Sequence, residues 1–269
     1  EQMEKDEHTI FWGVPTMLKM MKASEKFKTV NLDRIRYFVI GGEAMPIPLI
    51  KTWAEKGVPV RQGYGLTEVG PNVTSLDHSD AIRKQGSIGT PNFFYDVKLV
   101  DASDNEVGTN EIGEFIIKAD TVTPGYWKNE EATKNTIRDG WFHTGDLMTR
   151  DEEGYYYVVD RIKNMYISGG ENVYPAEVEH LIMQLNEVKD VAIIGVPHPK
   201  WGETGKAFIV KKEDAQITEQ QIVDYCIKNL AKYKTPQFVE FLDALPINNA
   251  GKIDRKTLRD AKKINKTLN

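Results

Sequence analysis

This 269-residue sequence has little cysteine, no long apolar run and no large excess of charge of either sign. Cys226 is its single cysteine, so a disulfide within the chain is excluded and a reducing compartment is favoured. Its apolar runs, such as residues 191–194, are far too short to span a bilayer. Residues 1–7 are charged and lack the apolar region of a signal peptide. We therefore expect a cytoplasmic protein without a transmembrane segment.

The formal net charge is only −5, which gives no global basic field and predicts that nucleic acid is not a partner. The histidines are scattered along the chain without the spacing of metal ligands, and no cysteine pair accompanies them. The G-x-S-x-G turn of many serine hydrolases is also missing. A zinc site and a serine-hydrolase triad are therefore set aside.

What is present describes an ordinary globular protein, with 40% hydrophobic and 28% charged residues and enough length for two domains. Residues 9–90 have the pattern of an α/β segment. Within them, the β-rich run 35–40 ends at Gly41 and Gly42, which is typical of a buried strand whose carboxyl end opens a loop.

The pattern changes twice further along the chain. From residue 86 to residue 160 short β-rich runs alternate with Gly and Asp turns, which predicts a meander or a small barrel. After Lys163 an α+β unit of about a hundred residues follows, a normal size for a domain. Within this unit, Thr218 and Gln221 form the capping-box signature of a helix N-terminus.

Five short segments are rich in glycine or in hydroxyl, carboxylate or basic side chains. They are 62–68 (QGYGLTE), 143–146 (HTGD), 160–163 (DRIK), 168–175 (SGGENVYP) and 251–255 (GKIDR). Together they resemble segments of the adenylate-forming acyl-CoA synthetases, and the match extends from about residue 11 to residue 259. The resemblance implies an enzyme that activates a carboxylic acid as its acyl-AMP and then transfers the acyl group to a thiol. It also implies ATP, Mg²⁺ and CoA as cofactors.

The implied fold is an α/β domain with a small β-barrel-like subdomain, followed by a mobile α+β C-terminal domain. We expect residues 1–85 to be the C-terminal part of the large nucleotide-binding domain, 86–160 the β-rich subdomain, 161–163 the hinge and 164–269 the small domain. Family members are about twice as long, and their Ser/Thr/Gly-rich phosphate loop is missing here. We therefore expect a fragment that is truncated at its N-terminus and inactive by itself. A sheet cut midway exposes strand edges, so a homodimer is the expected assembly.

Residues 63–68 match the part of the family site that holds the nucleotide. By this resemblance Tyr64 packs on adenine, Thr67 contacts the α-phosphate and Glu68 helps to hold Mg²⁺, for which a carboxylate is a suitable hard ligand. Gly63 and Gly65 would let the backbone approach the nucleotide closely. The alternative interpretation is a strand-to-helix turn in which Glu68 is a solvated charge.

Two further segments match groups around the nucleoside. Gly42, Glu43 and Ala44 resemble the loop that covers the other face of adenine, although a tight turn explains them equally well. Asp146 matches the aspartate that accepts hydrogen bonds from the ribose hydroxyls, and Arg161 matches the arginine that joins it there. Without the resemblance, Asp146 would be a hairpin residue and Arg161 one half of a surface ion pair.

The remaining matches lie in the C-terminal part of the chain. Lys163 corresponds to the family's hinge residue, and Gly169 and Gly170 would bring flexible backbone beside the pantetheine of CoA. Lys252 matches the adenylation lysine, because a mobile ammonium can bridge the substrate carboxylate and the α-phosphate. Trp201 either lines the CoA path or serves only in packing. The alternative for both lysines is a solvated surface position.

A fatty acid is the leading substrate, because residues 13–18 and the motifs look like those of fatty-acid–CoA ligases. An aryl or succinylbenzoate-type CoA ligase is a near alternative, since the missing half carries much of the selectivity. A carrier-protein-loading adenylation enzyme and a non-catalytic nucleotide-binding fragment remain as further alternatives.

Overall fold

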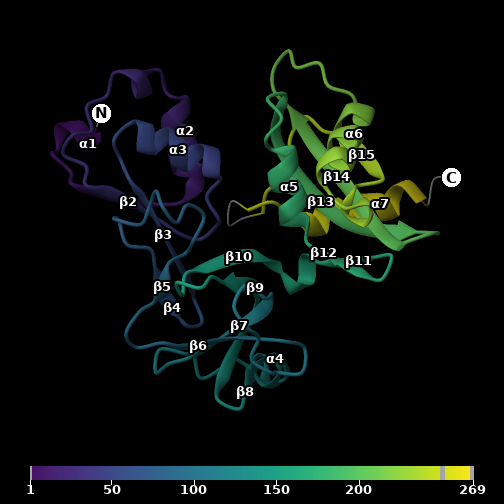
Figure 1. The fold of residues 1–269 in the computed structure, drawn as a ribbon, viewed down its shortest axis with the longest axis horizontal. Coiled ribbons are helices and arrows are strands. Elements are labelled where there is room, and N and C mark those ends of the chain that lie inside the picture. The colour runs from purple at the N-terminus through teal and green to yellow at the C-terminus, as the bar shows by residue number, and fades with distance from the viewer. Residues whose placement is uncertain (1, 249–251, 267–269) are drawn as a thin grey trace. The chain divides into compact units, whose positions relative to one another are not determined.

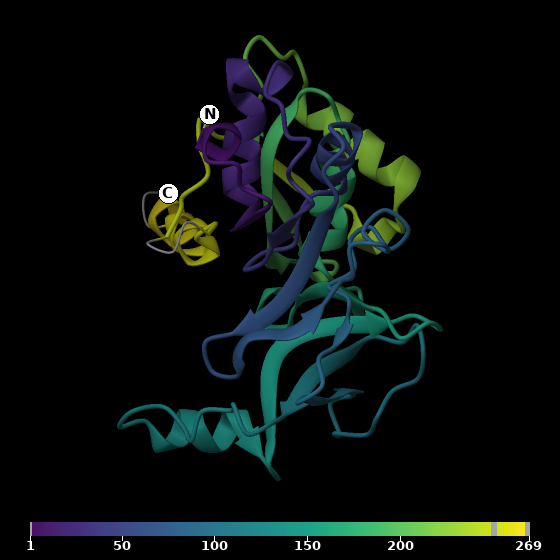
Figure 2. The ribbon, with the colours of Figure 1, turned by 90° about the vertical axis from the view of Figure 1, so that its left-hand side faces the viewer.

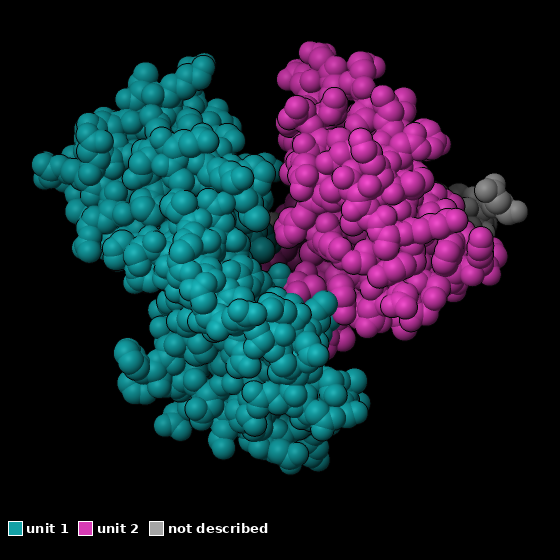
Figure 3. All heavy atoms as spheres, viewed as in Figure 1, with its two compact units in different colours: residues 1–158 teal, residues 159–269 magenta. Residues whose placement is uncertain are grey.

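The computed structural model describes residues 2–248 and 252–266. It divides into two compact units, residues 1–158 and residues 159–269, which Figure 3 shows in different colours. Each unit has its own hydrophobic core. Within the described ranges, none of the helices combines the length and the apolar character that crossing a bilayer requires.

The first unit begins with a sheet in the order β1-β2-β3-β4-β5, in which the first three strands are parallel (Figure 1). Its strands are β1 (Ile10–Gly13), β2 (Tyr37–Ile40), β3 (Val60–Leu66), β4 (Gly70–Ser75) and β5 (Thr90–Pro91). Its helices are α1 (Gln2–Lys5), α2 (Pro15–Ala23), the 3₁₀ turn η1 (Glu25–Lys28) and α3 (Ile47–Glu55). Leu18, Phe38 and Trp53 are almost fully buried between these elements, and the Phe38 and Trp53 rings pack edge to face at 5.0 Å.

The alternative interpretation of residues 62–68, a strand-to-helix turn, is wrong. The strand that ends near Leu66 does not lead into a helix, because β3 turns back through residues 67–69 and pairs with β4 in an antiparallel hairpin. Leu66 lies opposite Gly70, whose φ of +99° lies in the region that favours glycine. The carboxylate-bearing Glu68 therefore sits at a hairpin turn rather than in a first helical turn.

A second sheet completes this part of the chain, in the order β10-β9-β7-β6, with β8 paired to β9. Its strands are β6 (Asp96–Val100), β7 (Gly113–Lys118), β8 (Ile137–Arg138), β9 (Trp141–Arg150) and β10 (Tyr156–Arg161). The short helix α4 (Glu130–Thr136) packs beside β8 and β9 (Figure 1 and Figure 2). Val73 of β4 shares one core with Phe115, Met148 and Tyr156, so the end of the first sheet packs on the second.

The second unit is an α+β unit around a third sheet in the order β12-β11-β14-β13, with β15 parallel to β14. Its strands are β11 (Tyr166–Ser168), β12 (Glu171–Val173), β13 (Val188–His198), β14 (Gly202–Lys211) and β15 (Phe238–Phe241). Its helices are α5 (Pro175–Ile182), α6 (Glu219–Asn229), α7 (Arg255–Lys266) and the 3₁₀ turns η2 (Ile162–Asn164) and η3 (Lys232–Lys234).

Successive side chains of β13 and β14 point to opposite faces of this sheet, and apolar residues on both faces join a core. Ile193 and Ile209 join the core that contains buried residues of α5 and α6, whereas Ile194 and Phe208 join a second core with Leu258 of α7. The capping box predicted for α6 is confirmed, since Thr218 and Gln221 exchange hydrogen bonds at its N-terminus. The apolar run 238–245 favours a strand over its whole length, yet β15 ends earlier, at Phe241.

Candidate active site

The first unit brings together two predicted residues that are 82 positions apart in the sequence. The hydroxyl of Tyr64, on β3, donates a hydrogen bond of 2.6 Å to Oδ2 of Asp146, on β9. Asp146 is buried, with 4% of its surface exposed. The Tyr64 ring stands edge to face against Phe115 at 5.6 Å, so both its ring and its hydroxyl are held. An aromatic face and a carboxylate thus form one fixed group.

The turn that carries Asp146 is supported by hydrogen bonds from β7. Thr144 Oγ1 donates to the Phe115 carbonyl at 2.6 Å and accepts from the Asp146 amide at 3.0 Å. Gly145, with a φ of +69°, donates its amide to Glu114 Oε1 at 2.9 Å. Sequence analysis missed Glu114, because a single glutamate at the start of a strand gives no signal of what it will face.

Glu68 has a partner that the sequence did not indicate. Its Oε1 accepts a hydrogen bond of 3.1 Å from the hydroxyl of Tyr126, and its backbone carbonyl accepts one from the Thr123 amide at 2.7 Å. Burial and the negative charge of Glu68 raise the pKa of Tyr126, which keeps the tyrosine a proton donor at neutral pH. Glu68 is half-buried, and its neighbour Thr67 is exposed. The turn therefore presents an oriented carboxylate next to an accessible hydroxyl.

The loop after β2 is tied to β3 by a buried glutamine. Gln62 Oε1 accepts from the Met45 amide at 2.8 Å, and its side-chain amide donates to the Ser87 carbonyl at 3.3 Å. Gly42, in this loop, has a φ of +85°, a backbone conformation that favours glycine. Glu43 and Ala44 are exposed. The loop follows the carboxyl end of β2, the position where open α/β sheets bind ligands.

Gly65 is required by the hairpin. A Cβ at this position would lie 2.4 Å from the Gly70 carbonyl oxygen, a distance that no side chain tolerates. At Gly63 the nearest atom, the Thr74 carbonyl oxygen, would be 3.2 Å away. The close approach of β3 and β4 thus depends on glycine at position 65.

We expect Gly65→Ala to lower the free energy of unfolding by about 2–3 kcal/mol, because the backbone of β4 must move to accept the methyl group. Calorimetric unfolding of the 269-residue chain measures this. Gly41→Ala is the matched control, since its Cβ would meet only the Gly63 carbonyl oxygen at an ordinary 3.4 Å. Equal unfolding temperatures for the two variants would contradict the steric assignment.

In the second unit, the predicted hinge lies beside a buried acid. The Asp160 carboxylate accepts hydrogen bonds from the Arg161 amide at 2.6 Å, the Asn164 side chain at 3.0 Å and the Ala176 amide at 2.8 Å. The last of these joins the hinge segment to the first turn of α5. The carbonyl of Lys163 accepts from the Arg259 guanidinium at 3.3 Å.

Gly169 and Gly170 form the tight turn between β11 and β12, with φ values of +63° and +90°. Two positive φ angles in a two-residue hairpin are what glycine permits. The Gly169 amide donates to the Trp201 carbonyl at 2.9 Å, and a Cβ at position 169 would lie 2.7 Å from the Trp201 ring. The structure therefore places Trp201 directly against the predicted glycine loop.

Lys252 is exposed and precedes Ile253, which forms an isolated bridge with Ile247. Its amide donates to the Asn248 side chain at 3.1 Å, and its carbonyl accepts from the Asn248 amide at 2.8 Å. The predicted motif also includes Gly251, which lies outside the described residues.

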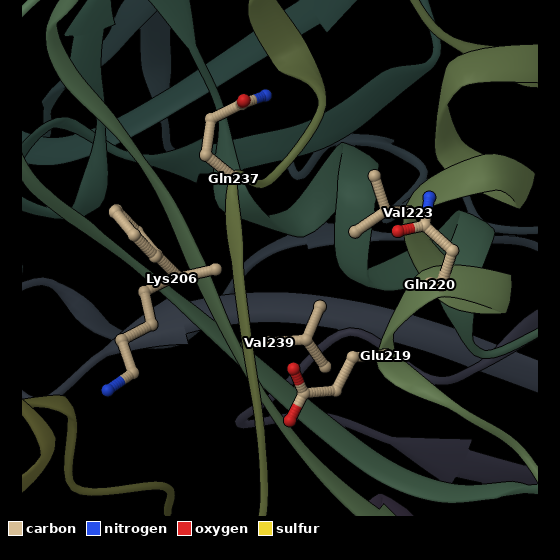
Figure 4. A pocket seen from close by; sticks show the side chains of 7 residues that line it. Lys206, Glu219, Gln220, Val223, Gln237 and Val239 are labelled. Carbon is tan, nitrogen blue, oxygen red and sulfur yellow. The ribbon is translucent and has the colours of Figure 1, made fainter.

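The described pockets do not coincide with these groups. One is a groove of about 400 Å³ in the second unit (Figure 4), and its lining residues are Lys206, Glu219, Gln220, Val223, Gln237, Phe238 and Val239. It lies between α6 and the strands β14 and β15. None of the predicted site residues lines it.

The fold and these groups define an α/β protein whose first unit carries a glycine loop at the carboxyl end of β2 and a fixed acid on β9. Comparison with known proteins gives the family. The model for the AMP-binding enzyme matches residues 1–127, and the model for the AMP-binding enzyme C-terminal domain matches residues 177–252. The chain belongs to the AMP-binding enzyme family. Its membership, recognised from the motifs, is thereby confirmed.

Among curated proteins, the chain is 42% identical over 257 residues to a feruloyl-CoA synthase from Amycolatopsis sp, covering 96% of this chain and 52% of the relative. It is 44% identical over 248 residues to a long-chain-fatty-acid–CoA ligase from Mycobacterium tuberculosis, covering 92% of this chain and 49% of the relative. The chain thus spans about half the length of the curated relatives it matches.

Among solved structures, the chain resembles o-succinylbenzoate CoA synthetase from Bacillus subtilis, in complex with the acyl-adenylate intermediate OSB-AMP. The TM-score is 0.86 at 34% identity, covering 96% of this chain and 52% of that one. The chain also resembles ATP-bound MatB from Rhodopseudomonas palustris, with a TM-score of 0.87 at 35% identity, covering 95% of this chain and 51% of that one. The predicted fold class, that of the adenylate-forming enzymes, is confirmed.

Proposed function

We propose that the chain is part of an acid–CoA ligase that forms an acyl-AMP from a carboxylic acid and ATP, and then a thioester with CoA. The observation that carries this proposal is the Tyr64–Asp146 hydrogen bond of 2.6 Å, which joins the two residues assigned to adenine and ribose. The curated relatives and the similar solved structure are named as CoA ligases or CoA synthetases, which supports the proposal.

Acyl activation requires an anionic carboxylate to attack the α-phosphate of an anionic nucleotide, so the enzyme must reduce charge repulsion and align the two partners. In our proposal Tyr64 packs on one face of adenine, and Gly42, Glu43 and Ala44 cover the other. Asp146, fixed by Tyr64, accepts hydrogen bonds from the ribose hydroxyls. The substrate nucleoside is thereby held before any bond changes.

The phosphate region is assigned to Thr67, Gly63, Gly65 and Glu68. The exposed Thr67 donates a hydrogen bond to the α-phosphate, and the glycines allow close backbone approach. No group of three histidine, cysteine or carboxylate side chains that could hold a metal ion occurs in residues 2–248 and 252–266. In our proposal Glu68 would hold Mg²⁺ together with substrate phosphates, as magnesium sites with one or two carboxylates do. Bound there, Mg²⁺ would neutralise phosphate charge.

The second unit supplies the remaining groups of the proposal. Lys252 places its ammonium between the substrate carboxylate and the α-phosphate, and Arg161 joins Asp146 at the ribose. Lys163 is the hinge about which the second unit rotates between the two half-reactions. The Gly169–Gly170 turn, with Trp201 against it, then lies beside the pantetheine arm of CoA.

A fatty acid is the substrate we propose first, and the Mycobacterium relative supports it. An aromatic acid is the second candidate, favoured by the feruloyl-CoA synthase and by a structure of an anthranilate CoA ligase with 35% identity. A panel of both acid classes, read by pyrophosphate release from a full-length enzyme that carries these residues, separates them. Activity only with a carrier-protein thiol would contradict the choice of CoA.

We also propose that these 269 residues do not complete the reaction alone, because the family's Ser/Thr/Gly-rich phosphate loop is not among them. The direct test is thioester synthesis by the chain with ATP, CoA and either acid class. Robust synthesis would contradict this part of the proposal, whereas binding of AMP without synthesis would support it.

We expect Tyr64→Phe to weaken AMP binding about tenfold, because the buried Asp146 loses a hydrogen bond that fixes it, a loss of about 1–3 kcal/mol. Calorimetric titration of AMP into the chain measures the change. Tyr157→Phe is the matched control, since its hydroxyl also donates to an aspartate, Asp151, at 3.2 Å. Equal weakening by both variants would contradict the nucleotide-binding role of the Tyr64–Asp146 pair.

A further inference from the structure

A charged pair in the second unit has no role in the chemistry described above. Arg255 Nη2 lies 2.7 and 2.8 Å from the two oxygens of Glu179, and the side chains are only 21% and 14% exposed. Glu179 Oε1 also accepts the Ile193 amide of β13 at 2.7 Å. Burial raises the pKa of the Glu179 carboxyl, and Arg255 and the Ile193 amide oppose this rise.

Such a pair contributes little net stability, because the loss of hydration offsets most of the attraction. In this pair one guanidinium nitrogen contacts both carboxylate oxygens, which fixes the distance between the two groups. Glu179 is on α5 and Arg255 is the first residue of α7. The pair therefore fixes where α7 begins relative to α5 and β13.

The beginning of α7 also lies close to Lys252 in the sequence. Only Ile253 and Asp254 separate Lys252 from Arg255, and the Asp254 amide donates to the Pro246 carbonyl at 2.8 Å. Ile253 packs against the core that holds Leu258. Apolar packing therefore holds Ile253 in place, and the ion pair holds Arg255 in place.

We propose that Glu179 and Arg255 are positioning residues that hold Lys252 at one place on the second unit. The inference rests on the proposed role of Lys252 in adenylation. Because the Ala176 amide of the same helix α5 donates to Asp160, the helix also joins the hinge segment. A rotation at the hinge then carries Lys252 as part of a rigid body rather than on a loose tail.

The test uses the double variant Glu179→Gln/Arg255→Met in a full-length enzyme that carries these residues. The introduced glutamine keeps an oxygen for the Ile193 amide and the introduced methionine keeps an apolar stem, so no buried charge is left unpaired. We expect kcat for acyl-AMP formation to fall about a hundredfold, as misplacement by about 1 Å can cause, with KM for ATP almost unchanged. Thioester formation from supplied acyl-AMP should stay within about twofold of the parent.

Two further measurements separate positioning from folding. In the 269-residue chain, amide hydrogen exchange at Lys252 and Asp254 should rise about tenfold in the double variant, while exchange in β13 stays unchanged. The single variant Arg255→Lys keeps a charged donor for Glu179, so its adenylation rate should lie between those of the double variant and the parent. Glu177→Gln is the control, because Glu177 is also on α5 but pairs with Lys234 at 2.7 Å on the exposed surface.

Equal loss of both half-reactions in the double variant would overturn the inference, because it would indicate a purely structural role. So would full adenylation in that variant when Lys252→Ala is inactive. Full adenylation in Lys252→Ala is a different result, since it overturns the proposed function itself. Loss confined to adenylation in the double variant, with normal activity of Glu177→Gln, supports the positioning role.

Discussion

Lys252→Ala is expected to lower the rate of acyl-AMP formation at least about a thousandfold, because the variant lacks the cation that stabilises charge in the transition state. Thioester formation from supplied acyl-AMP should remain within about twofold of the parent. The contacts between Asn248 and position 252 should survive, since they use the backbone amide and carbonyl of residue 252, which alanine retains. Pyrophosphate exchange and CoA acylation, measured on a full-length enzyme with these residues, give the two rates.

The control is Lys256→Ala, which removes another exposed lysine four residues further on while its amide keeps the hydrogen bond to Asp254. Both of its half-reactions should match those of the parent. If Lys252→Ala slows the two half-reactions equally, the assignment of Lys252 to adenylation fails.

Lys163→Pro is expected to separate the two half-reactions. Lys163 lies in the 3₁₀ turn η2, whose usual φ of about −50 to −70° is close to the value that proline imposes. Proline would favour this one backbone state and resist rotation, so the half-reaction that needs another state should slow. We expect the ratio of the two rates to change by about a hundredfold or more.

Lys163→Ala serves as the comparison, because it removes the ammonium but leaves the backbone free to rotate. Its ratio of half-reaction rates should equal that of the parent. A proline variant in which both rates are normal, or in which both fall together, would remove Lys163 from the hinge role.

The sequence predicted local structure well where the signal is local. The strand that ends just before Gly41 and the capping box at Thr218 both depend on neighbours within a few residues. The motifs also predicted the family, because each places several functional side chains at fixed spacing. The turn after Leu66 was left open between two interpretations, because a glycine-rich segment permits either a helix start or a hairpin, and pairing with β4 decided between them.

The candidate site was predicted as separate residues rather than as a structure. Tyr64 and Asp146 were both singled out, yet no rule of spacing relates residues on β3 and β9 or indicates that one donates to the other. Glu114 and Tyr126 were missed for the same reason, because each matters only through a residue far away in the sequence. The roles assigned to the site residues stay predictions until the variants are measured.

By itself the sequence determined the family, since the residue types in each motif set which charges and hydrogen bonds are available. Only the tertiary structure decided which of these groups support one another. The hydroxyl that fixes Asp146 and the carboxylate that fixes Arg255 both come from distant strands and helices. The reason is physical: composition sets what a side chain can do, but strand pairing and packing set what it touches.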